Sequence, residues 1–198
     1  MSALAQLYQD IVACRDCDLA KGRTKAVPGE GAEDADLFFI GEGPGWHEDQ
    51  QGRPFVGPAG QFLDQLLASV GLRREEVYIA NVIKCRPPQN REPLPAEIQT
   101  CRKWLDRQID LIQPRMIVTL GRHSLSLYFP AESIGKIHGK PRQVDGVIYY
   151  PMYHPAAALH QGSLRGTIEM DMLRIPQILA QCKELPQNVL EDRQLSLF

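Results

Sequence analysis

Three short, continuously apolar runs are spaced along the chain, with stretches of helical periodicity between them. These runs are typical of buried strands and cover residues 36–40, 77–82 and 116–121. A further segment, 142–150, alternates around Asp145-Gly146, which predicts a hairpin with a type I′ turn. Strands that alternate with helices predict a mostly parallel sheet covered on both faces. The expected fold class is therefore α/β, a three-layer α/β/α sandwich with a mostly parallel central sheet.

Apolar residues at helical spacing mark the segments around these strands. The opening helix, 2–13, carries Leu4, Leu7 and Ile11 on one face, with Ser2 as its N-cap. Further helices are expected from about Pro58 to Gly71, over 96–112, briefly after the third strand, and over about 163–181 with an interruption near Pro176. Residues 183–198 are polar and aperiodic until the tip, so we expect one domain over 1–182 and a flexible C-terminal tail.

The composition is that of a soluble globular domain, with 43% hydrophobic and 23% charged residues over 198 positions. No apolar run is long enough to span a membrane, and Asp10 interrupts the N-terminus where a signal peptide would be apolar. We therefore expect a cytoplasmic protein with no membrane partner. A net charge of −2 argues against a general polyanion binder, although the stretches 84–91 and 136–142 are locally basic.

Three loops that leave predicted strand ends are rich in glycine, proline or polar residues. They read GEGPG at 41–45, NVIKCRPP at 81–88 and YHPAAA at 153–158. Ligands of mostly parallel sheets bind outside the carboxyl ends of the strands, so these loops should converge. The first loop is neither a P-loop nor a dinucleotide fingerprint, because no Gly-Lys-Ser/Thr follows and the third glycine is missing. It supplies instead an acid, Glu42, and an aromatic ring, Phe55.

Four of the five cysteines are candidates for metal ligands, since a reducing compartment disfavours disulfides. Cys14 and Cys17 form a C-x-x-C pair after the first helix, and fifteen residues separate Cys85 from Cys101. A C-x-x-C that follows a helix is not typical of thioredoxin-like redox sites. The spacing is compatible with zinc, with an iron–sulfur cluster, and with cysteines that are simply buried. Cys182 is expected to be a plain thiol.

Taken together, GEGPG, GRPFVGPAG, ANVIKCRPP and HPAAAL resemble the family-four uracil-DNA glycosylases, in unbroken order from about residue 10 to 180. The resemblance implies a 4Fe–4S cluster held by the four cysteines of the candidate set, namely Cys14, Cys17, Cys85 and Cys101. It implies a monofunctional, monomeric enzyme that flips deoxyuridine out of single- or double-stranded DNA. Such an enzyme hydrolyses the N-glycosidic bond, releases uracil and leaves an abasic site, which begins base excision repair.

The resemblance also assigns the base-reading and catalytic roles. Phe55 would stack on the flipped base, and the amide of Asn81 would pair with the N3–H and O4 edge of uracil. His154 would donate a hydrogen bond to uracil O2, helped by the backbone at Gly41, while Glu42 would position or deprotonate the water. On the residues alone, Phe55 is equally compatible with a core position, Asn81 with a turn, and His154 with an ordinary loop histidine.

Further positions line the expected substrate path. Glu48 would lie against the C5 side of the base and help to exclude the methyl group of thymine. His160, Gln161 and Arg165 follow HPAAAL and are expected to contact DNA. Trp46 and His47 stand where typical members carry acidic residues, which leaves the breadth of accepted bases open.

The chain ends in QLSLF, which resembles the bacterial sliding-clamp-binding pentapeptide. Gln194, Leu195, Leu197 and Phe198 would dock into the clamp, or the apolar tip would fold back on the protein itself. Two other functions remain compatible with the sequence: a non-catalytic iron–sulfur module that binds DNA, and a zinc-stabilised nucleotide-binding protein. The joint presence of Glu42, Asn81 and His154 favours the enzyme.

Overall fold

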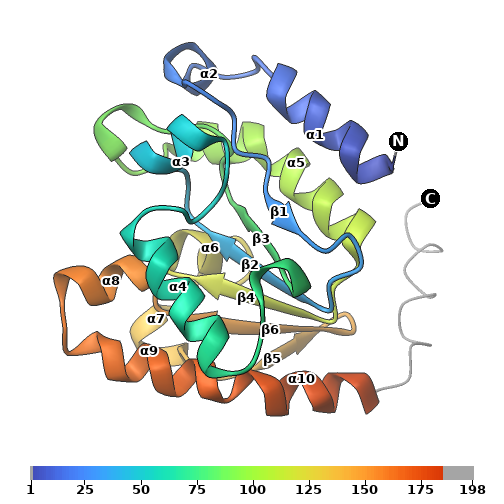
Figure 1. Ribbon diagram of the computed structural model, residues 1–198, viewed down its shortest axis with the longest axis vertical. Coiled ribbons are helices and arrows are strands. Elements are labelled where there is room, and N and C mark those ends of the chain that lie inside the picture. The colour runs from blue at the N-terminus through green and yellow to red at the C-terminus, as the bar shows by residue number, and fades with distance from the viewer. Residues whose placement is uncertain (1, 185–198) are drawn as a thin grey trace.

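A computed structural model describes residues 2–184, and its centre is a six-stranded sheet in the order β1-β3-β2-β4-β6-β5 (Figure 1). The strands are β1 (Glu30–Gly31), β2 (Leu37–Gly41), β3 (Tyr78–Asn81), β4 (Met116–Leu120), β5 (Arg142–Val144) and β6 (Val147–Met152). The four central strands run parallel to one another, and the short edge strands β1 and β5 are antiparallel to their neighbours. The predicted mostly parallel sheet is therefore confirmed.

Ten α-helices and two short 3-10 helices surround this sheet within the described range. The α-helices are α1 (Ala3–Ala13), α2 (Leu19–Gly22), α3 (Trp46–Gln51), α4 (Pro58–Ser69), α5 (Pro95–Ile112), α6 (Arg122–Ser126), α7 (Ile134–Ile137), α8 (Pro155–His160), α9 (Leu164–Leu173) and α10 (Ile175–Glu184). The 3-10 helices are η1 (Arg74–Glu76) and η2 (Pro88–Asn90). No helix among the described residues is long and apolar enough to cross a membrane.

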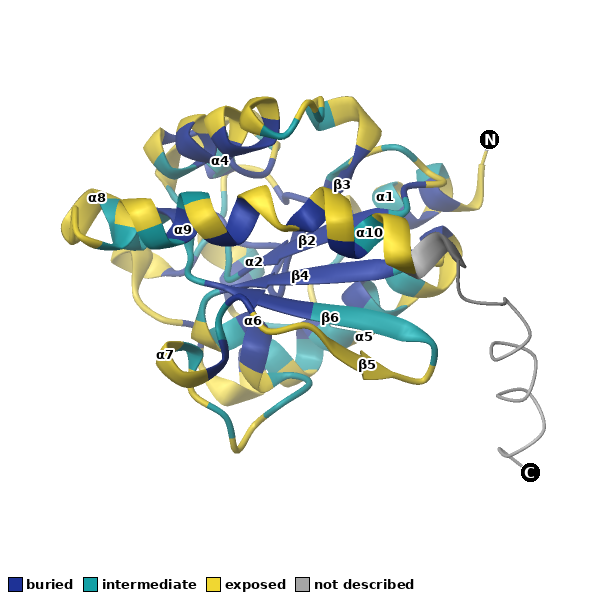
Figure 2. Cartoon of the chain, turned by 90° about the horizontal axis from the view of Figure 1, so that it is seen from below, coloured by how far each residue is buried: buried dark blue, intermediate teal, exposed yellow. Residues whose placement is uncertain are grey.

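The sheet separates two hydrophobic cores, because alternate residues of a strand point to opposite faces. Phe39 packs with α4, α9 and α10 on one face, whereas its neighbour Phe38 packs with α1 and α5 on the other. Figure 2 shows the buried strands β2 and β4 between these helices, with the exposed strand β5 at the edge. This arrangement is the predicted three-layer α/β/α sandwich.

The local signals in the sequence are borne out where a specific side chain or turn carries them. The Ser2 hydroxyl accepts a hydrogen bond from Ala5 N at 3.1 Å and caps α1. Asp145 and Gly146 have φ angles of 49° and 80°, the two positive values that a type I′ turn requires. The predicted interruption near Pro176 is the break between α9 and α10. The Gly-rich loop after β2 differs from expectation, since it contains the short helix α3.

Candidate active site and cysteine cavity

Gly41, Asn81 and His154 lie at or just beyond the carboxyl ends of β2, β3 and β6, with the ring of Phe55 beside them. A Cβ atom on Gly41 would lie 2.4 Å from Asn81 Oδ1 and 2.6 Å from the ring of Phe55. The rings of Phe55 and His154 are stacked, with centroids 5.4 Å apart and planes inclined by 25°. The structure thus brings together four residues that lie far apart in the sequence. Only glycine at position 41 permits this approach of amide and ring.

Asn81 presents an unpaired acceptor at this point. The side chain is 2% exposed, and its Oδ1 has no hydrogen-bond partner within the described part of the chain. A buried acceptor without a partner costs about 1–3 kcal/mol, so proteins rarely keep one without a reason. An oxygen in this state is suited to accept from a ligand that enters the pocket.

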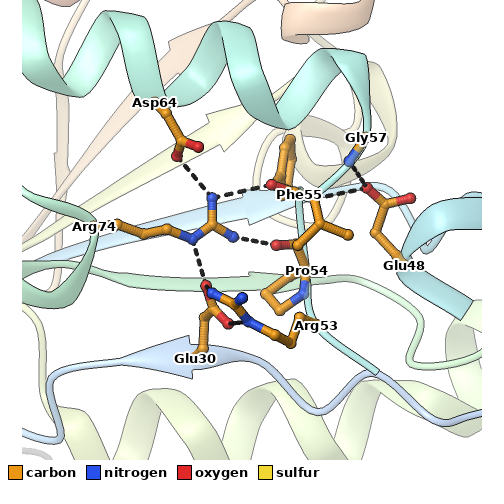
Figure 3. A network of polar contacts seen from close by, with 9 residues as sticks. Glu30, Glu48, Arg53, Pro54, Phe55, Gly57, Asp64 and Arg74 are labelled. Carbon is orange, nitrogen blue, oxygen red and sulfur yellow. Dashed lines mark hydrogen bonds and ion pairs between the residues drawn. The ribbon is translucent and has the colours of Figure 1, made fainter. Parts of the chain in front are cut away.

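Phe55 occupies a strained backbone conformation that its surroundings hold in place (Figure 3). Its φ is 51°, a left-handed value that costs a non-glycine residue about 1 kcal/mol or more. Arg74 Nη1 donates to Phe55 O at 3.0 Å, and Nη2 donates to Pro54 O. The same guanidinium forms ion pairs with Glu30 and with Asp64, the latter at 2.9 Å. These carboxylates neutralise its charge while it binds the loop carbonyls.

Glu48 holds the other side of this loop. Its Oε1 accepts hydrogen bonds from the backbone nitrogens of Val56 and Gly57 at 2.9 and 2.8 Å, and its Oε2 accepts from Gly45 N at 3.1 Å. The carboxylate therefore ties the Gly-rich turn to the segment that follows Phe55. This contact positions the loop, and the predicted contact of Glu48 with the C5 side of a base stays a prediction.

His154 is fixed as a neutral hydrogen-bond donor. It is the N-cap of α8, and its Nδ1 accepts from Ala156 N at 3.1 Å, which leaves the ring proton on Nε2. Burial lowers the pKa of His154 to about 4, although the charge of Glu48 opposes this effect. The imidazole is therefore uncharged at neutral pH and offers Nε2–H to the pocket.

Glu42, which directly follows β2, has a mixed electrostatic environment. Burial raises the pKa of its carboxyl above the ordinary value, the charge of Glu92 acts in the same direction, and His123 and Arg122 oppose them. His123 Nε2 lies 3.7 Å from Glu42 Oε2. A carboxylate poised in this way is suited to hold or deprotonate a water molecule.

A chain of hydrogen bonds runs from the backbone oxygen of Asn81 through Lys84, Gln108 and Tyr78 to Tyr8 on α1. The ammonium group of Lys84, 1% exposed, donates to Asn81 O at 2.8 Å and to Gln108 Oε1 at 2.6 Å. Gln108 Nε2 donates to Tyr78 OH at 2.9 Å, and the hydroxyls of Tyr78 and Tyr8 are 2.7 Å apart. Burial lowers the pKa of Lys84 to about 8, against the opposing influence of Cys101 and Cys85. This chain fixes the end of β3.

The four predicted cysteine ligands line one cavity between α1, α2, the loop after β3 and α5. The lining is otherwise mostly apolar or cationic and comprises Ile11, Cys14, Cys17, Ala20, Arg23, Lys84, Cys85, Thr100, Cys101 and Trp104. All four cysteines are free thiols, and Arg23 Nη1 donates to Cys85 Sγ at 3.0 Å. Burial raises the pKa of Cys101 to about 11, so its thiolate needs a positive partner such as a metal.

The four thiols are a donor set that suits either a zinc ion or an iron–sulfur cluster. Zinc holds each thiolate sulfur at about 2.3 Å, so its four ligands converge on one point. Within the described residues, no group of three or more His, Cys, Asp or Glu side chains is placed to hold one metal ion. A cluster with several metal atoms takes one sulfur on each of them, so its four ligands need not converge on one point.

Comparison with known proteins agrees with the family that the sequence motifs resemble. The model of the uracil DNA glycosylase superfamily matches residues 28–172. The chain belongs to that superfamily. A type-4 uracil-DNA glycosylase of Sulfurisphaera tokodaii is 45% identical over 188 residues, covering 90% of this chain and 86% of the relative. Enzymes with the same name from Archaeoglobus fulgidus and Thermotoga maritima are 44% and 46% identical, covering 90% and 76% of this chain and 94% and 80% of the relatives.

The residues predicted to contact DNA lie at the end of α8 and on α9, and they are exposed. His160 and Gln161 are exposed at the end of α8. Arg165 is exposed on α9, lies over the ring of Phe62 at 4.5 Å and donates to Glu169 Oε1 at 2.9 Å. Its guanidinium therefore already has partners in this structure, whereas His160 and Gln161 are open to solvent. Trp46, at the start of α3, is 52% exposed.

Two features of the site were not predicted from the sequence. They are the carboxyl end of β4, and the contacts of Arg74 and Glu30 that hold the loop around Phe55. Gly121 follows β4 with φ of 86°, and a Cβ there would lie 3.1 Å from His154 Cβ. Arg122 and His123 come next and face Glu42. The signal was available, since Gly-Arg-His directly follows a predicted buried strand. Arg74 and Glu30 carried no such signal, because only the folded chain brings them to Phe55.

Replacing Arg74 with methionine should destabilise the protein by about 1–3 kcal/mol, because two loop carbonyls lose their donor and Glu30 keeps only Arg53 as a partner. The matched control is Arg73→Met at the preceding position, which removes an exposed guanidinium that pairs with Glu76. Urea unfolding of the two variants and the wild type measures the difference. Equal losses of unfolding free energy in both variants would contradict the role given to Arg74.

Proposed function

We propose that this chain is a uracil-DNA glycosylase of the type-4 class. It hydrolyses the N-glycosidic bond of flipped deoxyuridine in DNA, releases uracil and leaves an abasic site that initiates base excision repair. The observation that carries this proposal is the buried, unpaired Oδ1 of Asn81 beside Gly41, Phe55 and His154. Relatives of that name, 44–46% identical, support it.

Base selection follows from the donor and acceptor pattern of one amide. Asn81 Oδ1 accepts from N3–H of uracil, and the amide nitrogen donates to O4. Cytosine presents an acceptor at N3 and a donor at its exocyclic nitrogen, so both contacts would be mismatched. The desolvation cost of the unpaired oxygen is recovered only when the correct edge arrives. Phe55 supplies an apolar face for the ring of the flipped base.

Catalysis depends on the charge that develops as the glycosidic bond breaks. Electron density moves to the leaving uracil, and the neutral His154 donates its Nε2–H to O2, where negative charge accumulates. The sugar becomes cationic, which the negative charge of Glu42 favours. Glu42 also orients the water that attacks C1′ and takes its proton. Arg74 and Glu48 serve this chemistry by holding Phe55, and they transfer no proton in it.

We further propose that Cys14, Cys17, Cys85 and Cys101 hold a 4Fe–4S cluster. When bound, the cluster supplies a covalent junction between the end of α1, the loop after β3 and α5. The free thiols around one mostly apolar cavity support this assignment. Cys85 follows Lys84, whose ammonium group is bonded to Asn81 O, so the junction would steady the strand end that reads the base.

The DNA partner is proposed to cross the rim formed by α3 and α8. His160 and Gln161 are exposed there and are suited to contact the phosphate backbone, with Arg165 behind them on α9. We propose that the enzyme acts as a monomer on single- or double-stranded DNA. Exposed Trp46 adds a ring on which a neighbouring base can stack.

We propose that the C-terminal motif binds the sliding clamp. Gln194, Leu195, Leu197 and Phe198 lie outside the described residues, as does the tail 185–198, so this assignment and the predicted boundary at 182/183 rest on the sequence. A short apolar motif at the end of a polar segment is suited to bind a pocket on a partner.

Asn81→Ala should lower the rate of uracil release by about 100-fold, because one preorganised contact to the leaving base is lost. Its unfolding curve should not move to lower denaturant, because Oδ1 has no partner in the protein to lose and its burial costs stability. Single-turnover release from a labelled oligonucleotide measures the rate. The control is Gln99→Ala on the exposed side of α5. Wild-type protein that binds uracil-containing DNA without releasing uracil would instead indicate a non-catalytic module.

The cluster proposal predicts a brown protein when it is purified without oxygen, with iron and sulfide in equal amounts and absorption in the visible charge-transfer region. Cys101→Ala should lose this absorption and unfold at a lower temperature. Cys182→Ala, which removes the cysteine outside the proposed set, should keep both. A colourless wild-type protein that contains zinc would contradict the cluster.

Deleting residues 194–198 should abolish binding to the bacterial sliding clamp and leave uracil release from free oligonucleotides unchanged. Surface plasmon resonance on immobilised clamp measures the first effect, and the single-turnover assay measures the second. Ser196→Ala is the matched control, because this position is not one of the anchors. Unaltered clamp affinity after the deletion would refute the assignment.

A further inference from the structure

The imidazole of His123 lies between two carboxylates beside the proposed site. Its Nε2 is 3.7 Å from Glu42 Oε2 and 3.7 Å from Glu92 Oε2. This nitrogen is buried and has no hydrogen-bond partner among the described residues, and the side chain as a whole is 14% exposed. A buried ring nitrogen without a partner costs about 1–3 kcal/mol, as the amide oxygen of Asn81 does.

The groups around His123 come from three separate loops or helices. Glu42 follows β2, Glu92 follows η2, and Arg122 and His123 begin α6 directly after β4. Arg122 forms an ion pair with Glu92, which draws that carboxylate toward the guanidinium. No Lys or Arg side chain of the described residues forms an ion pair with Glu42, whereas the imidazole of His123 lies within 4 Å of its carboxylate. The arrangement gives the two carboxylates different partners.

We propose that His123 is a positioning residue whose Nε2–H holds the carboxylate of Glu42 in place and in its charged form. Glu92 and Arg122 act as a second pair that fixes the imidazole between the two acids. This inference rests on the proposed function and concerns how Glu42 is prepared for it.

The distances fit a contact that tightens when substrate binds. A separation of 3.7 Å exceeds the usual 2.7–3.2 Å of a hydrogen bond, so a shift of about 1 Å in one flexible carboxylate is enough to close it. Catalytic hydrogen bonds are commonly long in structures without ligand. Substrate would also exclude water from the pocket and strengthen the interaction. A neutral imidazole is sufficient, because Nε2–H donates in either charge state when the proton is on that nitrogen.

The direction of each pH effect follows from the groups that face Glu42. Burial raises the pKa of Glu42, the charge of Glu92 raises it further, and His123 and Arg122 lower it. Glu42 must be ionised, so uracil release should increase as the pH rises through this pKa. Removing His123 should therefore move the acidic limb of the pH–rate profile to higher pH. Removing the charge of Glu92 should move the limb to lower pH.

The experiment is single-turnover uracil release from a single-stranded oligonucleotide, measured on the full chain between about pH 4 and 9. His123→Ala should shift the acidic midpoint upward by about one pH unit, and Glu92→Gln should shift it downward. Below the wild-type midpoint, an upward shift of one unit lowers the rate about tenfold. His123→Gln, whose amide nitrogen can replace Nε2–H, should restore most of the wild-type profile.

Two controls separate positioning from a general structural role. Glu132→Gln removes a carboxylate that pairs with Arg142 away from the site and should leave the midpoint unchanged. In a Glu42→Gln background, His123→Ala should cost no further activity, because the two residues act through one carboxylate. The limb that remains in Glu42→Gln is assigned to His154, whose pKa is about 4.

The proposal is overturned if His123→Ala and His123→Gln lose activity equally without a shift of the midpoint. It is also overturned if His123→Ala costs as much activity in the Glu42→Gln background as in the wild type. Unfolding curves show which variants are folded, and His123→Asn, whose shorter amide does not reach Glu42, replaces an unstable alanine variant. A wild-type protein that releases no uracil at any pH would refute the proposed function itself, which is a separate outcome.

Discussion

Two charged side chains hold the backbone around Phe55 from opposite sides, and the geometry of the pocket depends on this clamp. Arg74 binds the carbonyls of Pro54 and Phe55, while Glu48 binds the amides of Val56 and Gly57. Peptide dipoles thus meet charges of the appropriate sign on each side, which offsets the left-handed strain at Phe55. Without that strain the ring would not lie against Gly41 and His154. The position of the ring proposed to stack on the base is therefore set by charged contacts of its backbone.

A second constraint links the cysteine cavity to Asn81, whose amide is proposed to read the base. Lys84 lies in the lining of the cavity and also donates to Asn81 O, and Gln108 continues the chain toward Tyr78 and Tyr8. A fully buried ammonium group is tolerated only when acceptors surround it. The ammonium group in turn fixes the positions of its acceptors. The end of β3 is held from its buried side, which leaves the side chain of Asn81 aimed into the pocket with Oδ1 unpaired.

Features governed by local sequence were predictable, and features that depend on contacts between distant segments were not. Periodicity located the central strands and the long helices, and Asp145-Gly146 fixed the hairpin, because each signal lies within a few residues. The convergence of Gly41, Asn81 and His154 followed from the rule for parallel sheets. The Arg74–Glu30 pair could not be predicted, since its members lie 44 positions apart in the sequence and an Arg near Glu residues is ordinary on a surface. His123 was overlooked because β4 was read as a core strand with no site of its own.

Burial acts on the two proposed catalytic groups with opposite consequences. The same loss of solvent that lowers the pKa of His154 to about 4 raises the pKa of Glu42. For His154 the effect is useful, because a neutral imidazole with its proton on Nε2 is the donor that the leaving uracil requires. For Glu42 it is harmful, because a protonated acid neither activates water nor favours a cationic sugar. Desolvation therefore suits one group and opposes the other. The positive and donating side chains at the start of α6 therefore lie beside Glu42, while the N-terminus of α8 donates only to Nδ1 of His154.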